Sequence, residues 1–194
     1  MAKKILVAYA TRYGSTLEVA EKISEKLQEL GHDCDCMDFQ DVEDITKYDG
    51  LIAGSAIHMG KWLPEAKEFM EGKRAFLSTI PVVLFSLGIT LTNPTDHVTR
   101  KALFATDEIC QYVTPKEIKL FAGRLIRDEL IDADRDIVIL AKPPFGDFRD
   151  YRELERCLTA RWRIPSVPQS SASVPADISS PVPSPPMPRE RWRS

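Results

Sequence analysis

A short turn rich in hydroxyl groups, residues 11–16, is the segment whose residue types best suit a chemical role. It follows an apolar run and precedes an amphipathic helix, so it lies at a helix N-terminus. Free backbone N–H groups, hydroxyl donors and the positive end of the helix dipole together suit a phosphate. Serine and threonine also favour helix starts as plain caps, and the residues alone leave that alternative open. The candidate binding residues of this turn are Thr11, Arg12, Tyr13, Gly14, Ser15 and Thr16.

The kind of phosphate follows from the motifs that this turn lacks. It has neither the Gly-Lys-Ser/Thr sequence of a triphosphate loop nor the GxGxxG spacing of a dinucleotide site. Ser15 has no GxSxG sequence around it, so serine hydrolase chemistry is unsupported. We therefore expect a terminal monophosphate as the ligand group.

Alternating strand and helix patterns predict the elements that hold this turn. Strands are expected at residues 5–9, 32–39, 49–57, 81–87 and 117–122, with helical periodicity between them. This order predicts an α/β three-layer sandwich around a five-stranded parallel sheet. We expect Asn93 to cap the helix after the fourth strand, residues 137–141 to be helical, and Asp147 to cap a closing helix. The buried face of that closing helix is predicted to be Phe148, Tyr151, Leu154, Leu158 and Trp162.

Two further turns are candidates for the same site, because ligands of an open parallel sheet bind at the carboxyl ends of its strands. These turns follow the third and fourth predicted strands, at residues 55–62 and 86–92.

The spacing around the first turn resembles the flavodoxin signature. The pattern is Tyr9-x-Thr11-x-x-Gly14-x-Thr16-x-x-x-Ala20-x-x-Ile23, although Ala8 stands where that signature usually has a larger apolar residue. The resemblance implies that the turn holds the phosphate of FMN, and it implies the strand order 2-1-3-4-5 of flavodoxin-like sheets. It covers about residues 3–160. It places the flavin ring against Ala56, Ile57, His58, Met59, Gly60 and Lys61, and against Ser86, Leu87, Gly88, Ile89 and Thr90.

One branch of the family is especially similar. Gly54-Ser55-Ala56-Ile57 with Met59-Gly60, and the later run at 146–151, resemble the menaquinone-dependent protoporphyrinogen oxidases and related stand-alone flavodoxin domains. The resemblance implies a flavoprotein that passes electrons between a donor and an acceptor, either a redox partner protein or a quinone. The alternative is an FMN-dependent oxidoreductase of the protoporphyrinogen IX dehydrogenase type, which acts in haem biosynthesis. A third alternative is an interaction module without redox activity.

Several single residues have two possible roles. Arg12 meets the phosphate charge or points to water, and Trp62 stacks on the flavin ring or packs in the core. His58 donates to the flavin or a substrate, or is a solvated loop histidine. Asp132, Asp134 and Asp136 are expected to form a solvated helix start rather than a calcium loop. Residues 124–146 lie where the oxidase branch has an insertion, and their apolar side chains approach a membrane surface or belong to a buried connecting helix.

Charge near the ring predicts its redox behaviour. The third-strand turn carries His58 and Lys61, with no acidic residue before Glu65. Because negative charge disfavours the anionic reduced flavin, we expect a higher potential than that of a carrier with an acid-lined ring.

Composition limits the remaining classes of function. The chain has 194 residues and a net charge of −3, which disfavours nucleic-acid binding. Its richest apolar stretch, residues 80–91, is too short and interrupted to be an integral membrane segment, although peripheral membrane contact stays open. The four cysteines form no disulfide or zinc pattern, so a cytoplasmic protein with reduced thiols is expected. Residues 1–162 are predicted to be the domain, and 163–194 a proline- and serine-rich disordered tail.

Overall fold

A computed structural model describes residues 2–161 of the chain, except for the side chains of residues 137, 141 and 157–161. The tail predicted for 163–194, and Trp162 at the end of the closing helix, lie outside the described residues.

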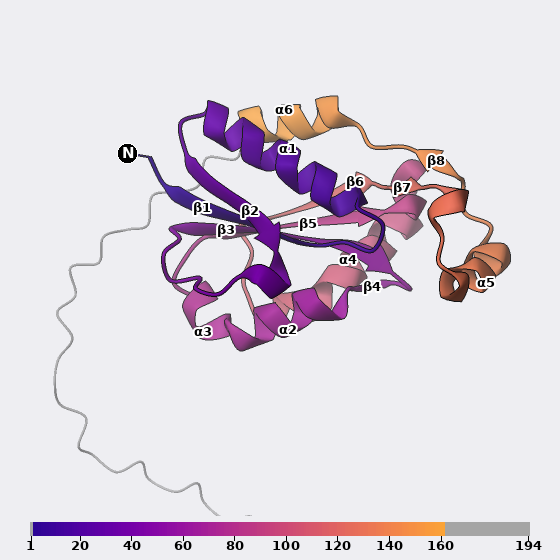
Figure 1. The fold of residues 1–194 in the computed structure, drawn as a ribbon, viewed down its shortest axis with the longest axis horizontal. Helices are drawn as coiled ribbons and strands as arrows, with labels where there is room; N and C mark the ends of the chain where they lie inside the picture. The colour runs from indigo at the N-terminus through magenta and orange to yellow at the C-terminus, as the bar shows by residue number, and fades with distance from the viewer. Residues whose placement is uncertain (1, 162–194) are drawn as a thin grey trace, which may run out of the picture.

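A parallel sheet forms the centre of the molecule (Figure 1). Its strands are β1 (Lys4–Ala10), β2 (Asp33–Asp38), β3 (Gly50–His58), β5 (Val82–Gly88) and β6 (Glu117–Ala122), in the order β2-β1-β3-β5-β6. Since β5 and β6 are the fourth and fifth strands expected from the sequence, the predicted order 2-1-3-4-5 is confirmed. A two-residue strand, β4 (Lys61–Trp62), pairs antiparallel with the end of β3 and was not predicted.

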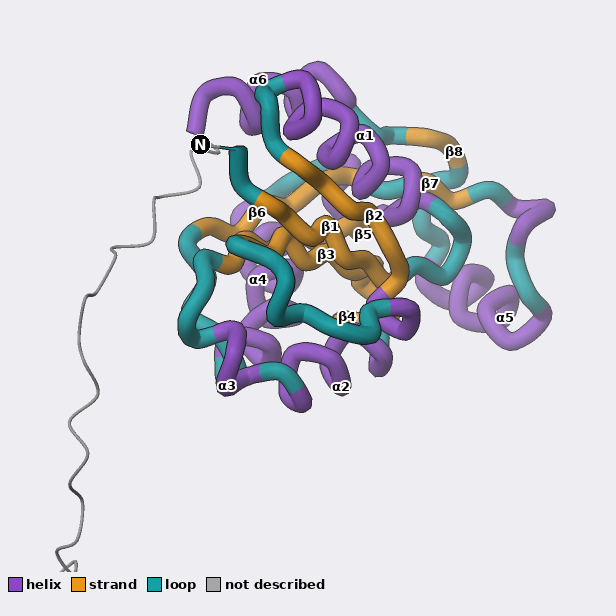
Figure 2. Tube along the Cα trace, turned by 60° about the vertical axis from the view of Figure 1, so that its left-hand side comes forward, coloured by secondary structure: helices purple, strands orange, loops and turns teal. Residues whose placement is uncertain are grey.

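Helices cover both faces of this sheet (Figures 1 and 2). α1 (Ser15–Glu29) and α6 (Tyr151–Arg161) lie on one face, and α2 (Pro64–Gly72), α3 (Arg74–Leu77) and α4 (Asp96–Cys110) lie on the other. α5 (Asp132–Ala141) covers neither face and lies beyond the end of the sheet. Short 3-10 turns occur at η1 (Phe39–Asp41), η2 (Ile89–Thr92) and η3 (Arg127–Glu129).

The chain between β6 and α6 extends away from the sheet, and the two ends of this segment lie side by side. β7 (Arg124–Leu125) and β8 (Gly146–Asp147) pair antiparallel, with Arg124 opposite Asp147. The segment between them, which includes α5, is therefore a long excursion closed at its base by a two-stranded ribbon. The helix predicted at residues 137–141 is confirmed as the last half of α5.

The core has two layers, one on each face of the sheet. Ile5 and Val7 of β1 pack in the layer under α1, whereas Leu6 and Ala8 pack in the layer toward α2 and α4. All four are fully buried, which explains why this strand is apolar without alternation. At Gly54 of β3 an added Cβ would lie 1.9 Å from the ring of Phe85, so only glycine fits there.

Two predicted helix caps are wrong. α4 begins at Asp96, where the Thr95 hydroxyl accepts a hydrogen bond from the backbone N–H of Val98 at 3.3 Å, so Asn93 is not the cap. α6 begins at Tyr151, and the Asp150 carboxylate accepts from the N–H groups of residues 152 and 153 at 2.9 and 3.1 Å. Asp147 instead pairs with an arginine, as described below. In both cases a nearby residue supplies an equally good cap acceptor.

Candidate functional site

Three turns meet at the carboxyl end of the sheet, because β1, β3 and β5 are adjacent and parallel. They are the turn at residues 11–14 after β1, the hairpin that joins β3 to β4, and η2 after β5. An added Cβ on Gly88, just before η2, would lie 3.6 Å from Cδ1 of Ile57, so the second and third turns are in contact. The structure therefore brings the three predicted segments to one place.

The first turn has the backbone of an anion site. Gly14 is the N-cap residue of α1 and has a φ of +75°, a left-handed conformation that favours glycine. The Thr11 hydroxyl accepts a hydrogen bond from the backbone N–H of Thr16 at 3.3 Å. No side chain caps the helix from position 14, so the first turn of α1 presents N–H groups together with the helix dipole.

The hydroxyl of Thr16 indicates which kind of ligand group this turn can bind. Thr16 is fully buried, and its Oγ1 has no hydrogen-bond partner among the described residues. A buried hydroxyl without a partner is costly, so such atoms usually mark a ligand or a water. The hydroxyl, the left-handed glycine and the helix N-terminus together match the donor set that a phosphate monoester requires.

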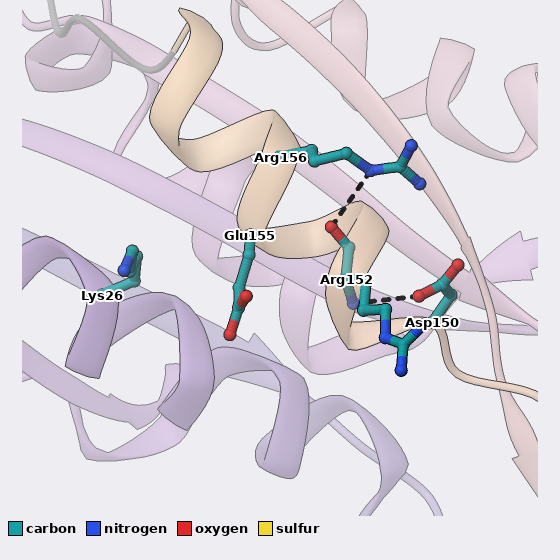
Figure 3. Close-up of a pocket in the computed structure, with 5 residues that line it drawn as sticks. All are labelled: Lys26, Asp150, Arg152, Glu155 and Arg156. Atoms are coloured by element: carbon teal, nitrogen blue, oxygen red, sulfur yellow. Dashed lines mark hydrogen bonds between the residues drawn. The ribbon is translucent and has the colours of Figure 1, made fainter.

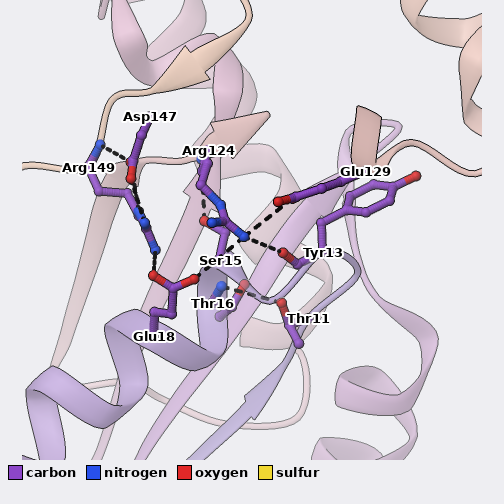
Figure 4. A network of polar contacts seen from close by, with 9 residues as sticks. All are labelled: Thr11, Tyr13, Ser15, Thr16, Glu18, Arg124, Glu129, Asp147 and Arg149. Carbon is purple, nitrogen blue, oxygen red and sulfur yellow. Dashed lines mark hydrogen bonds and ion pairs between the residues drawn. The ribbon is translucent and has the colours of Figure 1, made fainter. Parts of the chain in front are cut away.

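A network of charged residues surrounds the same turn (Figure 4). The Arg124 guanidinium donates to the carbonyl of Tyr13 at 3.2 Å and contacts Glu129 at 3.3 Å and Glu18 at 3.5 Å. The backbone N–H of Arg124 donates to the Ser15 hydroxyl at 3.3 Å. Ser15 is therefore tied to the base of the α5 excursion.

A second arginine completes this network. Arg149 contacts Asp147 at 2.5 Å and Glu18 at 2.6 Å, and its side chain is only 6% exposed. The paired carboxylate of Asp147, with help from Glu18, raises the pKa of Arg149 above its ordinary value. Neither arginine was predicted from the sequence as a site residue, although Arg124 follows the fifth strand almost directly and so lies at the carboxyl edge of the sheet.

Asp134 of α5 joins the first turn to the hairpin. Its carboxylate accepts two hydrogen bonds from Arg12, at 2.5 and 2.9 Å, and one from the hydroxyl of Tyr13. His58 Nε2 lies 3.2 Å from Oδ1 of Asp134. Arg12 first, then Tyr13 and His58, lower the pKa of Asp134 to about 2 despite its burial. The expected solvated position is thus wrong for Asp134, which is 4% exposed. Arg12, whose side chain is 31% exposed, is paired with Asp134 and is not free to turn toward a ligand.

The hairpin after β3 presents an unusual turn. Met59 and Gly60 have φ values of +51° and +78°, which is the pattern of a two-residue type I′ turn. Met59 is 75% exposed, Lys61 is exposed, and Ala56, Ile57 and His58 are half-buried.

The third candidate segment is divided between interior and surface. Ser86 and Leu87 are buried, and the Ser86 hydroxyl accepts a hydrogen bond from Trp62 Nε1 at 2.8 Å. Trp62 is itself buried, so of its two readings the structure supports packing. Gly88 is buried, Ile89 is half-buried and Thr90 is exposed, so side-chain contact with a ligand is open to the last two.

The remaining candidates do not form a site. Burial raises the pKa of the Cys34 thiol to about 11 and that of Cys36 to about 12, which makes both poor nucleophiles and metal ligands. A surface hollow of about 600 Å³ between α1 and α6 is lined by charged side chains, among them Lys26 and Glu155, and includes the Asp150 cap (Figure 3). It lies outside the three turns, and none of its lining residues is among those with a buried, unpartnered side-chain polar atom in the described part of the chain.

These features define a class of protein: an open, parallel α/β sheet with a candidate anion-binding turn at the start of its first helix and two further turns beside it. A family model described as the flavodoxin domain matches residues 6–146. The chain therefore belongs to the flavodoxin-domain family, and the predicted flavodoxin-like fold and FMN cofactor are confirmed at this level. Electron transfer through FMN is the function that family membership supports.

Individual relatives are more distant. The protoporphyrinogen IX dehydrogenase [quinone] of Escherichia coli strain K12 is 27% identical over 93 residues, which are 47% of this chain and 51% of that protein. The chain thus spans about half the length of the curated relative. Flavodoxin 2 from Bacillus cereus has a TM-score of 0.47 and 24% identity over 62% of this chain and 84% of that one. A flavoprotein from Lactobacillus acidophilus in complex with FMN has a TM-score of 0.48 and 16% identity, over 61% and 93% of the two chains.

Proposed function

We propose that the turn at residues 11–16 binds the phosphate of FMN and that the flavin ring lies between the β3–β4 hairpin and η2. The observation that carries this proposal is the buried Thr16 hydroxyl, which has no partner among the described residues and lies at a helix start capped by a left-handed glycine. FMN supplies the redox chemistry, because its ring accepts and returns one or two electrons. The protein exchanges those electrons between a donor and an acceptor, which is a redox partner protein or a quinone.

The residues of the chain do three things in this proposal. Thr11, Thr16 and the backbone of the turn bind and orient the phosphate. Buried Trp62 and Ser86 hold the two ring turns together through their hydrogen bond of 2.8 Å. His58 stands at the mouth of the site, where Asp134 fixes its ring and favours a proton on Nε2.

Electrostatics around the ring site support a potential above that of an acid-lined carrier. The structure adds one carboxylate that the sequence analysis did not place there, Asp134. Arg12 neutralises it through two hydrogen bonds, so the positive charge of Lys61 stays unbalanced within this group.

The test of FMN binding uses a variant of the turn and a matched control. Wild-type protein is purified, its bound cofactor is released and identified by absorbance, and stoichiometric FMN is expected. The double variant Gly14→Val, Thr16→Val is expected to fold and lose flavin. Thr106→Val is the control, because Thr106 is also fully buried but bonds to the carbonyl of Ala102 in α4. Stoichiometric flavin retained by the folded double variant contradicts the proposed site.

A quinone-coupled protoporphyrinogen dehydrogenase is the second candidate function. It is favoured by the match to the curated enzyme and by the α5 excursion, whose Ile139 and Leu140 are 70% and 87% exposed. Such exposure does not fit a buried connecting helix, and it supports peripheral contact with a membrane that holds a quinone. Within the described residues, no helix is long and apolar enough to span a bilayer.

The two functions differ in what reduces the flavin. Protoporphyrinogen IX is added anaerobically to the FMN-loaded protein, followed by a quinone. Bleaching of the flavin by the first compound and its recovery with the second support the enzyme; a flavin that responds only to a protein reductant supports the carrier. We also propose a cytoplasmic location. We further propose a domain boundary at residue 162, and limited proteolysis with mass spectrometry of the fragments tests that boundary.

A further inference from the structure

We propose that Arg124 provides the counter-charge for the phosphate of the bound flavin, and that Glu129 competes with this phosphate for the same guanidinium. The inference rests on the proposed FMN site and adds one binding residue and one opposing residue to it. Arg124 lies in β7 at the base of the α5 excursion, and Glu129 lies in η3 within it. Both are outside the turn that the sequence motif covers.

The backbone of Arg124 is fixed beside the turn. Its pairing with Asp147 in the β7–β8 ribbon holds one side, and its N–H bond to the Ser15 hydroxyl, 3.3 Å long, holds the other. The preceding residue, Gly123, donates to the carbonyl of Gly88 at 3.2 Å. The position of Arg124 therefore follows from the ends of both β5 and β6.

The guanidinium of Arg124 lies beside Tyr13 and Gly14 of the turn. Its Nη2 donates to the Tyr13 carbonyl at 3.2 Å and is 4.0 Å from the point where a Cβ on Gly14 would be. Any anion bound by the N–H groups near Gly14 is thus within reach of this side chain (Figure 4).

Unused hydrogen-bond donors make Arg124 available to a ligand. Its contacts within the described residues all run through Nη2, whereas its buried Nε has no partner there. A guanidinium carries five N–H donors, so most of them remain for a further acceptor. The buried side-chain polar atoms without a partner in the described part of the chain are those of Thr16, Arg124 and His32. Thr16 lies in the turn, and Arg124 contacts the turn through the Tyr13 carbonyl.

The two carboxylates near Arg124 are not equivalent. Glu18 lies 2.6 Å from the buried Arg149 but 3.5 Å from Arg124, so its charge is mainly used by Arg149. Glu129 contacts Arg124 at 3.3 Å, and its side chain is 42% exposed. A surface ion pair of this kind is weak, and a phosphate held by several donors can displace it. Glu129 is therefore the group that a phosphate must replace.

The test compares FMN with riboflavin, which has the same ring without the phosphate. Dissociation constants of both flavins are measured by quenching of flavin fluorescence in the full-length wild-type protein and in Arg124→Gln, Glu129→Gln and Arg127→Gln. The last is the control, an exposed arginine of the same excursion that lies over Phe145. Thermal unfolding of each variant checks that it is folded.

The expected results have opposite signs. Arg124→Gln weakens FMN binding by about tenfold, the effect of one lost charge-assisted hydrogen bond, and leaves riboflavin binding unchanged. Glu129→Gln tightens FMN binding and also leaves riboflavin unchanged, and the control alters neither. Glu129→Gln keeps the inference testable if Arg124→Gln does not fold.

Two outcomes overturn the inference in distinguishable ways. If wild-type protein binds FMN but Arg124→Gln affects both flavins equally, or Glu129→Gln weakens FMN, the assignment of Arg124 fails while the FMN site stands. If wild-type protein binds neither flavin, the proposed function fails and the inference fails with it.

Discussion

Replacing Asp134 with asparagine removes one negative charge from the place where α5 meets two of the three turns. The carboxylate is 4% exposed and accepts from Arg12, Tyr13 and His58. Asn keeps the shape but is neutral, and its amide N–H₂ faces groups that are themselves donors. We expect Asp134→Asn to destabilise the fold and to loosen α5 from the turns.

The size of the effect follows from the pKa of this carboxyl. Its partners lower the pKa from the ordinary 3.8 to about 2, and the difference corresponds to about 2.5 kcal/mol of stability. In a protein of this size, such a loss lowers the melting temperature by roughly 5–10 °C. Because the folded pKa is the lower one, this stability is fully present above about pH 4 and is lost as the pH falls toward 2.

Urea unfolding of wild type and variant at neutral pH, and again at several pH values between 4 and 2, measures both effects. Asp136→Asn is the matched control, since Asp136 is an exposed residue of the same helix. The variant should differ from wild type by about 2.5 kcal/mol at neutral pH and by less as the solution becomes acidic. Equal stability of Asp134→Asn and the control, or a difference that stays constant down to pH 2, would contradict this role of Asp134.

Two further predictions concern the hairpin after β3. Met59→Asn should stabilise the fold by about 1 kcal/mol, measured by urea unfolding. Met59 has a left-handed φ of +51°, and Asn-Gly is a preferred pair in a type I′ turn. Equal stability would show that Met59 causes no backbone strain in this turn. Lys61→Glu should lower the midpoint potential of the bound flavin, measured by dye-equilibrated reduction, by roughly tens of millivolts, because negative charge opposes the anionic reduced ring. An unchanged potential would place Lys61 away from the ring.

Local sequence predicted the place of the first candidate turn in the fold. The turn at residues 11–16 lies between a strand and a helix that are close in the chain, and their periodicities and the glycine at position 14 mark it clearly. The strand order of the sheet was predicted from the family resemblance. Periodicity indicates where strands begin and end, but it does not indicate which strands are neighbours in the sheet. β4 was missed because a two-residue strand has no period to detect.

Long-range partners could not be found in this way. Asp134 is 122 residues from Arg12, and Arg149 is 131 residues from Glu18. Nothing in the spacing of Asp132, Asp134 and Asp136 distinguishes the buried carboxylate from the exposed ones. The distinction arises only when α5 is placed against the turns, where one side of the helix meets an arginine, a tyrosine and a histidine.

The excursion between β7 and β8 is coupled to the candidate flavin site at three points. Its base carries Arg124 against the phosphate turn, its 3-10 turn carries Glu129 against the same guanidinium, and its helix carries Asp134 against the hairpin. The same helix exposes Ile139 and Leu140 on its outer side. A partner or membrane that covers these apolar side chains therefore acts on a segment that contacts both the turn at residues 11–16 and the β3–β4 hairpin. If the proposed FMN site is right, covering Ile139 and Leu140 is expected to alter flavin affinity without contact with the flavin.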